Sequence, residues 1–267
     1  MMKERTLRVL EFTKIRDRLA SKAMTEMGRE RCEALVPSSN ITEIQRMQAE
    51  TEEATVILQY VGASPLVPFS DVRASLTLAE KGATLSPKAL LEVAALMQSA
   101  RAARKALDTE RDNTPILKEL AQRLSTLHNV EQDITNAIIS EDEIADRASN
   151  ELMDIRRHLR GANERIKEKL NQMIRSSAFQ KYLQDPIVTM RNDRYCLPVK
   201  AEYRGSVPGL VHDQSSTGAT LFIEPMAAVE MGNELKTWAA KEKQEIERIL
   251  AALSAEIAPY ADQLRET

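Results

Sequence analysis

The sequence is poor in aromatic residues, in glycine and in cysteine. Aromatic residues make up 4% of the 267 positions, which argues against a β-sandwich and against platforms on which nucleic-acid bases stack. The two cysteines, Cys32 and Cys196, lie far apart, so no disulfide framework is expected and a reducing, cytoplasmic setting fits. No apolar run approaches the roughly 20 residues of a membrane span, and the charged N-terminus has no apolar signal core. We therefore expect neither secretion nor a membrane partner.

What is present favours helices. Hydrophobic residues make up 43% and charged residues 29% of the chain, with only 8 glycines and 10 prolines, a balance typical of a soluble, mainly helical protein. The formal net charge of −3 excludes a uniformly basic nucleic-acid binder. Any contact with nucleic acid would need a local basic patch.

Residues 1–135 are predicted to be a run of helices. Asn40 with Glu43 has the pattern of a capping box, and Ser86-Pro87 is a strong helix start. Loops are expected at 62–65 and at 111–115. The first helix is predicted to place four apolar residues on one face: Leu7, Leu10, Ile15 and Leu19.

A long helix is predicted from 141 to about 175, with Ser140 and Glu143 as a second capping box. Its apolar positions recur at steps of three and four in a narrow seam, as in a coiled coil. A helix of that length, about 50 Å, cannot bury its seam alone. A second helix, predicted from 226 to about 257, is the expected antiparallel partner. The seam comprises Ile144, Ala148, Leu152, Ile155, Leu159, Ala162, Ile166, Leu170 and Met173.

Between the two helices the pattern changes to short β-prone segments. Strands are predicted at 187–190, 195–199, 210–212 and 219–223, with turn residues at 192–193 and 215–218. Pro198 suggests an edge strand or a bulge. The expected fold is mainly α, with a helical body and a long antiparallel helical pair that carries a small antiparallel sheet.

The stretch RNDRYCLPVKAEYRGSVPGLVHDQSSTGATLFIEPMAAVEMGNEL, within residues 188–235, resembles the clamp-region signature of the bacterial MutS-II family. The opening TLRVLEFTKIRDRLA and the segment DVRASLTLAEKGATLSPKALLEVA are similar to the N-terminal core of that family. The resemblance covers essentially the whole chain. It implies a helical core at 1–135, an outgoing lever helix at 136–183, a β clamp at 184–225 and a returning lever helix at 226–267.

The resemblance also implies what the parent protein does. Family members are homodimeric ATPases, and many carry a C-terminal Smr endonuclease domain. They are linked to suppression of homologous recombination through branched or double-stranded DNA, and to the splitting of collided ribosomes. No G-x-x-x-x-G-K-[ST] motif occurs here. We therefore expect a fragment that grips nucleic acid without being an enzyme itself, with ATP and Mg²⁺ belonging to the parent's ATPase domain.

The best candidate interface is the basic stretch 156–181, which has eight cations against two carboxylates. The alternative interpretation is a solvated coiled-coil face whose cations pair with Glu242, Glu245 and Glu247 on the returning helix. In the sheet region, four further cations are balanced by four carboxylates. The predicted nucleic-acid-binding residues are Arg156, Arg157, Arg160, Arg165, Lys167, Lys169, Arg191, Arg194, Lys200 and Arg204.

Two other functions remain open. One is a protein-only interaction scaffold built on the coiled coil, and the other is a nuclease centre made from Asp193, Asp213 and Glu224. The three histidines have no metal-binding spacing with the cysteines, so no metal site is expected. Trp238 falls on the seam of the returning helix and is expected to pack there rather than stack on a nucleotide.

Overall fold

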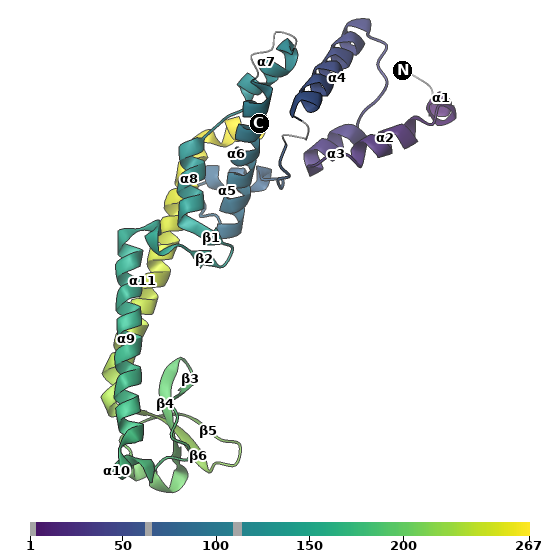
Figure 1. The fold of residues 1–267 in the computed structure, drawn as a ribbon. Helices are drawn as coiled ribbons and strands as arrows, with labels where there is room; N and C mark the ends of the chain where they lie inside the picture. The colour runs from purple at the N-terminus through teal and green to yellow at the C-terminus, as the bar shows by residue number, and fades with distance from the viewer. Residues whose placement is uncertain (1–3, 62–65, 109–113) are drawn as a thin grey trace. The chain divides into compact units, whose positions relative to one another are not determined.

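The computed structural model describes residues 4–61, 66–108 and 114–267 (Figure 1). The fold is mainly helical with one four-stranded antiparallel sheet, as predicted. The chain divides into two compact units, which are described separately: unit 1 comprises residues 1–145 and 249–267, and unit 2 comprises residues 146–248. Helix α11, Met226–Ile257, contributes to both. Within the described ranges, no helix combines the length and apolarity that crossing a bilayer requires.

Unit 1 is built from helices around one apolar core. Fully buried side chains from four of its elements include Leu76, Leu90, Ile134 and Ile257. Burial of such side chains contributes roughly 1.5–3 kcal/mol each relative to exposure. Its elements are α1 (Glu4–Val9), α2 (Phe12–Ala20), α3 (Glu26–Glu33), α4 (Ile41–Val61), α5 (Arg73–Glu80), α6 (Pro87–Leu107), α7 (Pro115–Arg123), α8 (His128–Ala137), β1 (Ile138–Ser140), β2 (Glu143–Ile144), the end of α11, η3 (Ala258–Tyr260) and α12 (Ala261–Glu266).

Two predicted helix starts in unit 1 are confirmed. The hydroxyl of Ser86 accepts a hydrogen bond from the Ala89 N–H at 3.2 Å, and Pro87 occupies the first position of α6. Asn40 Oδ1 accepts from the N–H groups of residues 42 and 43, but the Glu43 carboxylate accepts from the Ser38 hydroxyl instead of completing the capping box. The loop predicted at 62–65 and most of the loop predicted at 111–115 lie outside the described residues.

The single helix predicted for residues 7–19 is wrong. The backbone breaks between α1 and α2, where Glu11 takes a left-handed conformation with φ 53°. The predicted apolar face is largely exposed: Leu10 is 57%, Ile15 64% and Leu19 46% accessible. Helical spacing was therefore present in these residues, but the described part of the chain does not cover that face.

The capping box predicted at Ser140 is also wrong. Residues 138–144 form the β1–β2 hairpin, which buries Ile138 and Ile144 against the core of unit 1. The Ser140 hydroxyl accepts from the Asp142 N–H in the turn. The long helix α9 (Asn150–Arg175) begins after η1 (Asp146–Ala148), and its N-cap is Ser149, whose hydroxyl accepts from the Leu152 N–H at 2.9 Å.

Unit 2 contains the predicted antiparallel helical pair. Contacts between α9 and α11 run in opposite directions along the chain: Ser149 meets Glu245, Arg156 meets Glu242 and Arg165 meets Glu234. The predicted seam of α9 is buried at Leu152, Ile155, Ala162, Ile166 and Leu170. Leu159 and Met173 are only half-buried, and in the last turn Ile174 is buried instead of Met173. Because the helix starts later than predicted, Ile144 and Ala148 lie outside it.

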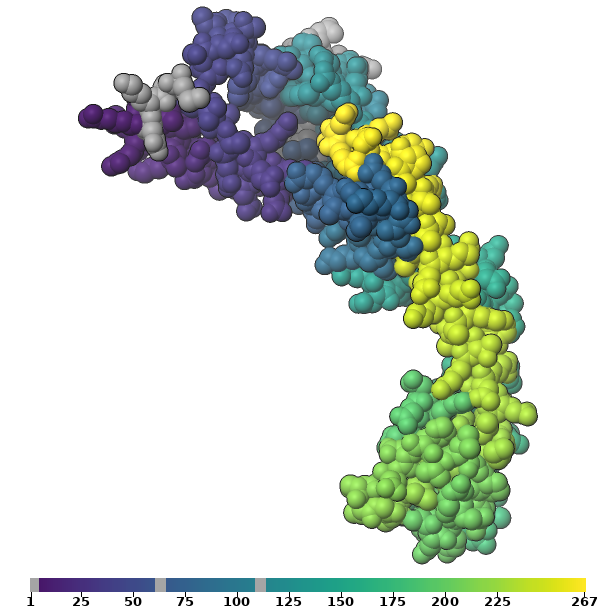
Figure 2. Space-filling model, turned by 180° about the vertical axis from the view of Figure 1, so that it is seen from behind, coloured from purple at the N-terminus to yellow at the C-terminus, as the bar shows by residue number. Residues whose placement is uncertain are grey.

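The sheet of unit 2 lies beside the end of α9, with strand order β3-β4-β6-β5 (Figure 1). Figure 2 shows the sheet region, in green, gathered beside the yellow-green residues of α11. All three pairings are antiparallel, and Asn192 and Asp193 form the β3–β4 turn with φ values of 50° and 57°, as the predicted turn requires. Its inner face packs Leu197, Val199 and Ile223 against α9. The elements are α10 (Ser177–Gln180), β3 (Thr189–Arg191), β4 (Arg194–Lys200), η2 (Ala201–Ser206), β5 (Gly209–Gln214) and β6 (Thr220–Pro225).

Pro198 does not mark an edge strand, because β4 is an inner strand of the sheet. The β3 partner ends opposite Cys196, and beyond it the Pro198 carbonyl accepts from the Gln184 N–H at 2.8 Å. The N and O atoms of one strand residue point to the same side, so the nitrogen of Pro198 faces away from β6. Its missing N–H therefore removes no bond between β4 and β6.

Candidate nucleic-acid interface

The basic stretch on α9 does not form one stripe. At about 100° per residue, four cations fall within about 80° of one another on the helix. Glu164 and Glu168 lie on the same face, which lowers its positive charge. Lys169 lies about 160° away from Lys167, toward the side of Arg165. The sequence count of eight cations therefore overstates the charge of any one surface. The four cations on the shared face are Arg157, Arg160, Lys167 and Arg175.

Four of the six predicted cations on α9 are paired with carboxylates. Arg156 contacts Asp146 at 2.6 Å and Glu242 at 2.7 Å, and Arg160 contacts Asp146 at 3.2 Å. Hydrogen bonds from Arg156 and then Arg160 lower the pKa of Asp146. Burial opposes the charge of Arg156, but its two carboxylate partners outweigh that cost and raise its pKa.

Arg157 and Arg165 are engaged more weakly. Arg157 pairs with Asp154 one turn earlier at 2.8 Å, and Arg165 pairs with Glu234 across the two helices at 3.1 Å. Both arginine side chains are more than half exposed, so each pair is worth about 0–1 kcal/mol. A phosphate could therefore replace either carboxylate at little cost.

Among the predicted residues on α9, Lys167 and Lys169 are exposed and have no ion pair within the described residues. Arg175 in the last turn shares this state. The Lys181 ammonium lies 4.9 Å from the centre of the Tyr182 ring. Within the basic stretch 156–181, these are the cations that a phosphate can contact without displacing a carboxylate.

In the sheet region, three of the four predicted cations contact the protein itself. Arg191 pairs with Asp213 at 3.1 Å and lies 4.0 Å from the Phe222 ring centre. Arg204 donates to the Val207 carbonyl and to the Gly209 carbonyl at 3.2 Å. Lys200 is half-buried, and no partner for its ammonium lies among the described residues. Of the ten predicted residues, Lys167, Lys169 and Lys200 are therefore the ones whose side chains have neither an ion pair nor a hydrogen bond there.

A buried polar cluster on the outer face of the sheet was not anticipated from the sequence. The Glu224 side chain is 1% exposed and contacts Arg194 at 3.2 Å and His212 Nε2 at 2.8 Å. Arg194 also donates to Asn233 of α11 at 2.5 Å. Burial, followed by the nearby Glu224 charge, raises the pKa of Cys196 to about 11. The cluster joins three strands to α11, so Arg194 has a structural role here.

The proposed nuclease triad is not assembled. Glu224 is buried in the cluster just described, and Asp213 is paired with Arg191. Across the described ranges, no three His, Cys, Asp or Glu side chains come together in a way that could hold a metal ion.

Trp238 packs within unit 2, as predicted. Its ring stacks on His158 of α9 with centroids 4.3 Å apart and planes 13° apart. The Lys241 ammonium covers it at 4.2 Å, and its N–H donates to Glu234 at 3.3 Å. The tryptophan thus ties the two helices together.

Comparison with known proteins identifies relatives along the entire chain, although no family model matches. The chain is 46% identical over 269 residues to a protein of Acetivibrio thermocellus named Endonuclease MutS2, covering 99% of this chain and 34% of that protein. It is 48% identical over 266 residues to the Endonuclease MutS2 of Symbiobacterium thermophilum, covering 100% and 33%. The chain spans about a third of the length of these curated relatives. The chain is therefore homologous, over its whole length, to the N-terminal third of the proteins named Endonuclease MutS2.

Proposed function

We propose that this chain is the nucleic-acid-gripping core, lever and clamp region of a MutS2-type protein, and that DNA is its target. Support comes from the homology to proteins named endonucleases and from Lys167 and Arg175, which share one face of α9, are exposed and have no ion pair among the described residues. A cation without a carboxylate partner can neutralise a phosphate without first giving up an ion pair. These two cations carry the proposal.

In this proposal, the paired arginines have a different task. Arg156, with two carboxylate partners, holds η1 and α11 against α9 and leaves phosphate contact to residues farther along the helix. ATP hydrolysis, its Mg²⁺ and any nuclease chemistry are assigned to other parts of the parent protein, which we propose acts as a cytoplasmic homodimer.

The test is a salt titration of DNA binding by the 267-residue chain, with fluorescence anisotropy on a labelled four-way junction. If about three phosphates are neutralised, log K falls against log salt with a slope of about −3. Lys167→Glu with Arg175→Glu should weaken binding and make the slope shallower by about 2. The matched control is Lys236→Glu with Lys243→Glu, two exposed lysines of α11 in the same unit.

If both double variants lose the same amount of DNA affinity, the result would contradict a defined interface on α9. A protein-only scaffold is the competing function, because four of the α9 cations already have carboxylate partners. The scaffold would be favoured if the chain fails to bind DNA and binds ribosomes with an affinity that neither salt nor either double variant changes.

A further inference from the structure

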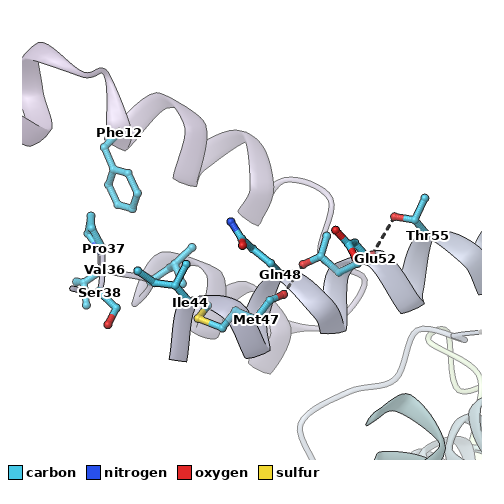
Figure 3. Close-up of a pocket in the computed structure, with 11 residues that line it drawn as sticks. Phe12, Val36, Pro37, Ser38, Ile44, Met47, Gln48, Glu52 and Thr55 are labelled. Atoms are coloured by element: carbon cyan, nitrogen blue, oxygen red, sulfur yellow. Dashed lines mark hydrogen bonds between the residues drawn. The ribbon is translucent and has the colours of Figure 1, made fainter. Parts of the chain in front are cut away.

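A groove of unit 1 has the size of a ligand site but not the chemistry to hold an anion. It has a volume of about 700 Å³, and its lining includes Phe12 of α2 with Ile44 and Met47 of α4 (Figure 3). The charged residue of that lining is Glu52, whose carboxylate repels a phosphate. Cations able to hold a phosphate occur instead on the helical pair of unit 2.

Arg165 and Lys169 form a second cationic face on α9. They are one turn apart and about 40° from each other around the helix, so their side chains are neighbours. Both residues are exposed. Lys167 lies about 160° around the helix from each of them, which separates this face from the one that carries Lys167. A guanidinium and an ammonium one turn apart can both contact a single phosphate.

A carboxylate occupies this face in the free chain. The Nη2 atom of Arg165 donates to both carboxylate oxygens of Glu234 on α11, at 3.1 and 3.2 Å. The two side chains are 54% and 43% exposed, and an exposed pair of this kind is weak enough for a phosphate to displace the carboxylate. Glu234 therefore stands where a phosphate oxygen would bind.

Glu234 has a second donor that remains when Arg165 leaves. The indole N–H of Trp238, one turn later on α11, donates at 3.3 Å to the same Glu234 oxygen, Oε1, that Arg165 contacts at 3.1 Å. The indole itself is held by the stacked ring of His158, with centroids 4.3 Å apart, and by the Lys241 ammonium at 4.2 Å. Glu234 can therefore give up Arg165 and keep a hydrogen-bond donor.

We propose that Arg165 and Lys169 form a phosphate site that Glu234 closes in the free chain, and that a phosphate opens the site by displacing Glu234 from Arg165. Lys169 has no ion pair among the described residues, so it attracts the phosphate first. Arg165 then adds charge-assisted hydrogen bonds. The inference rests on the proposed function for the source of the phosphate, which is the backbone of a nucleic acid.

Opening the site also exchanges a contact between two helices for a contact with the ligand. Arg165 and Glu234 join α9 to α11 at a point nearer the sheet than the Arg156–Glu242 and Ser149–Glu245 contacts. With Arg165 on a phosphate, the pairing of the helices there depends on the buried seam. Nucleic-acid binding and helix pairing are thereby linked, and a change in one alters the free energy of the other.

A double-mutant cycle of DNA binding, measured with the labelled four-way junction, tests the competition. Glu234→Gln should tighten binding up to about fivefold, because no ion pair has to be broken, and should steepen the salt slope by about 1. In an Arg165→Gln background, Glu234→Gln should change affinity less than about twofold. The matched control is Glu247→Gln, which removes the same charge from an exposed position about 20 Å farther along α11, beyond the Debye length of about 8 Å, and should also change affinity less than about twofold.

A second measurement needs no DNA. The sequence has one tryptophan, so the indole N–H of Trp238 gives a single resonance that reports on Glu234. Titration with inorganic pyrophosphate should move this resonance downfield to saturation in the wild type, because Glu234 then accepts from the indole without sharing its oxygen with Arg165. In Arg165→Gln the same titration should leave the resonance almost unmoved.

The two measurements separate the site from the proposed function. If no variant binds DNA but pyrophosphate moves the resonance in the wild type and not in Arg165→Gln, the phosphate site stands and the nucleic-acid function fails. An equal gain in DNA affinity from Glu234→Gln with and without Arg165 would overturn the site. So would an indole resonance that pyrophosphate leaves in place in the wild type, or moves equally in the wild type and in Arg165→Gln.

Discussion

Removing Arg194 should loosen the sheet of unit 2 far more than removing an arginine from an exposed ion pair. The Arg194 side chain is 12% exposed and its partner Glu224 is 1% exposed. Replacement by methionine keeps much of the side-chain volume but leaves the Glu224 carboxylate with His212 as its remaining ion-pair partner among the described residues. The matched control is Arg165→Met, because Arg165 and Glu234 are 54% and 43% exposed in a pair of similar length.

The magnitude follows from burial. Breaking a buried pair by removing one partner costs about 3–5 kcal/mol, and the remaining contact with His212 places Arg194→Met at the lower end, about 3 kcal/mol. The exposed Arg165 pair should be worth about 0–1 kcal/mol. At about 1.4 kcal/mol per decade, Arg194→Met should raise the local opening equilibrium about 100-fold.

Hydrogen exchange of the backbone amides in β4 and β6 measures that equilibrium directly. We expect exchange there to accelerate about 100-fold in Arg194→Met and to stay within a few-fold of wild type in Arg165→Met. The double variant Arg194→Met with Glu224→Leu should recover much of the loss, because no uncompensated charge remains. Unchanged exchange in Arg194→Met would refute the reasoning that this cluster holds the sheet to α11.

Three further variants probe the same fold. Leu170→Ala, at a fully buried seam position, should cost about 2–5 kcal/mol in urea unfolding, whereas Met153→Ala, at a side chain that is 45% exposed, should cost far less; equal costs would contradict the assigned seam. Ser149→Ala should lower the free energy of unfolding by about 1 kcal/mol in the same assay, because it removes the N-cap of α9. An unchanged free energy of unfolding would contradict the assignment of Ser149 as the cap. Burial, followed by the charge of Asp133, raises the pKa of the Glu256 carboxyl above its usual value of about 4.5, so its contribution to stability is present below about pH 4.5 and is lost as pH rises through the raised pKa. Glu256→Gln should remove this loss of stability with rising pH, as melting temperatures measured at a series of pH values would show. Melting temperatures of variant and wild type that change equally with pH would contradict the prediction.

The period of apolar residues was enough to predict the main elements of unit 2. Buried Leu152 and Leu170 sit on the seam that their spacing indicated, and the turn residues Asn192 and Asp193 fixed the β3–β4 hairpin. Local patterns succeed here because one helix face and one turn conformation are decided by residues close in sequence.

The prediction failed where tertiary burial competed with a local signal. Ser140 and Glu143 match a capping box, but burial of the β-branched Ile138 and Ile144 favours a hairpin at that point. Ser149, nine residues later, provides the cap instead.

The sequence alone could not predict which of the candidate cations are engaged in ion pairs with carboxylates. Arg156 and Glu242 are 86 positions apart, and their contact depends on the register between α9 and α11, which no local pattern specifies. The same holds for Arg194 and Glu224, which are 30 positions apart and lie on the paired strands β4 and β6. A count of charges therefore identified the basic stretch but not which of its members are unpaired.

The reach of the β3–β4 hairpin across the sheet has a consequence for association. The Asn192 amide donates to the His212 carbonyl at 3.0 Å, and Arg204 donates to the Gly209 carbonyl at 3.2 Å, so side chains already occupy backbone acceptors of the edge strand β5. A strand from another molecule would have to displace both before it could hydrogen-bond along that margin. The β5 edge of the sheet is thereby protected against the addition of a foreign strand.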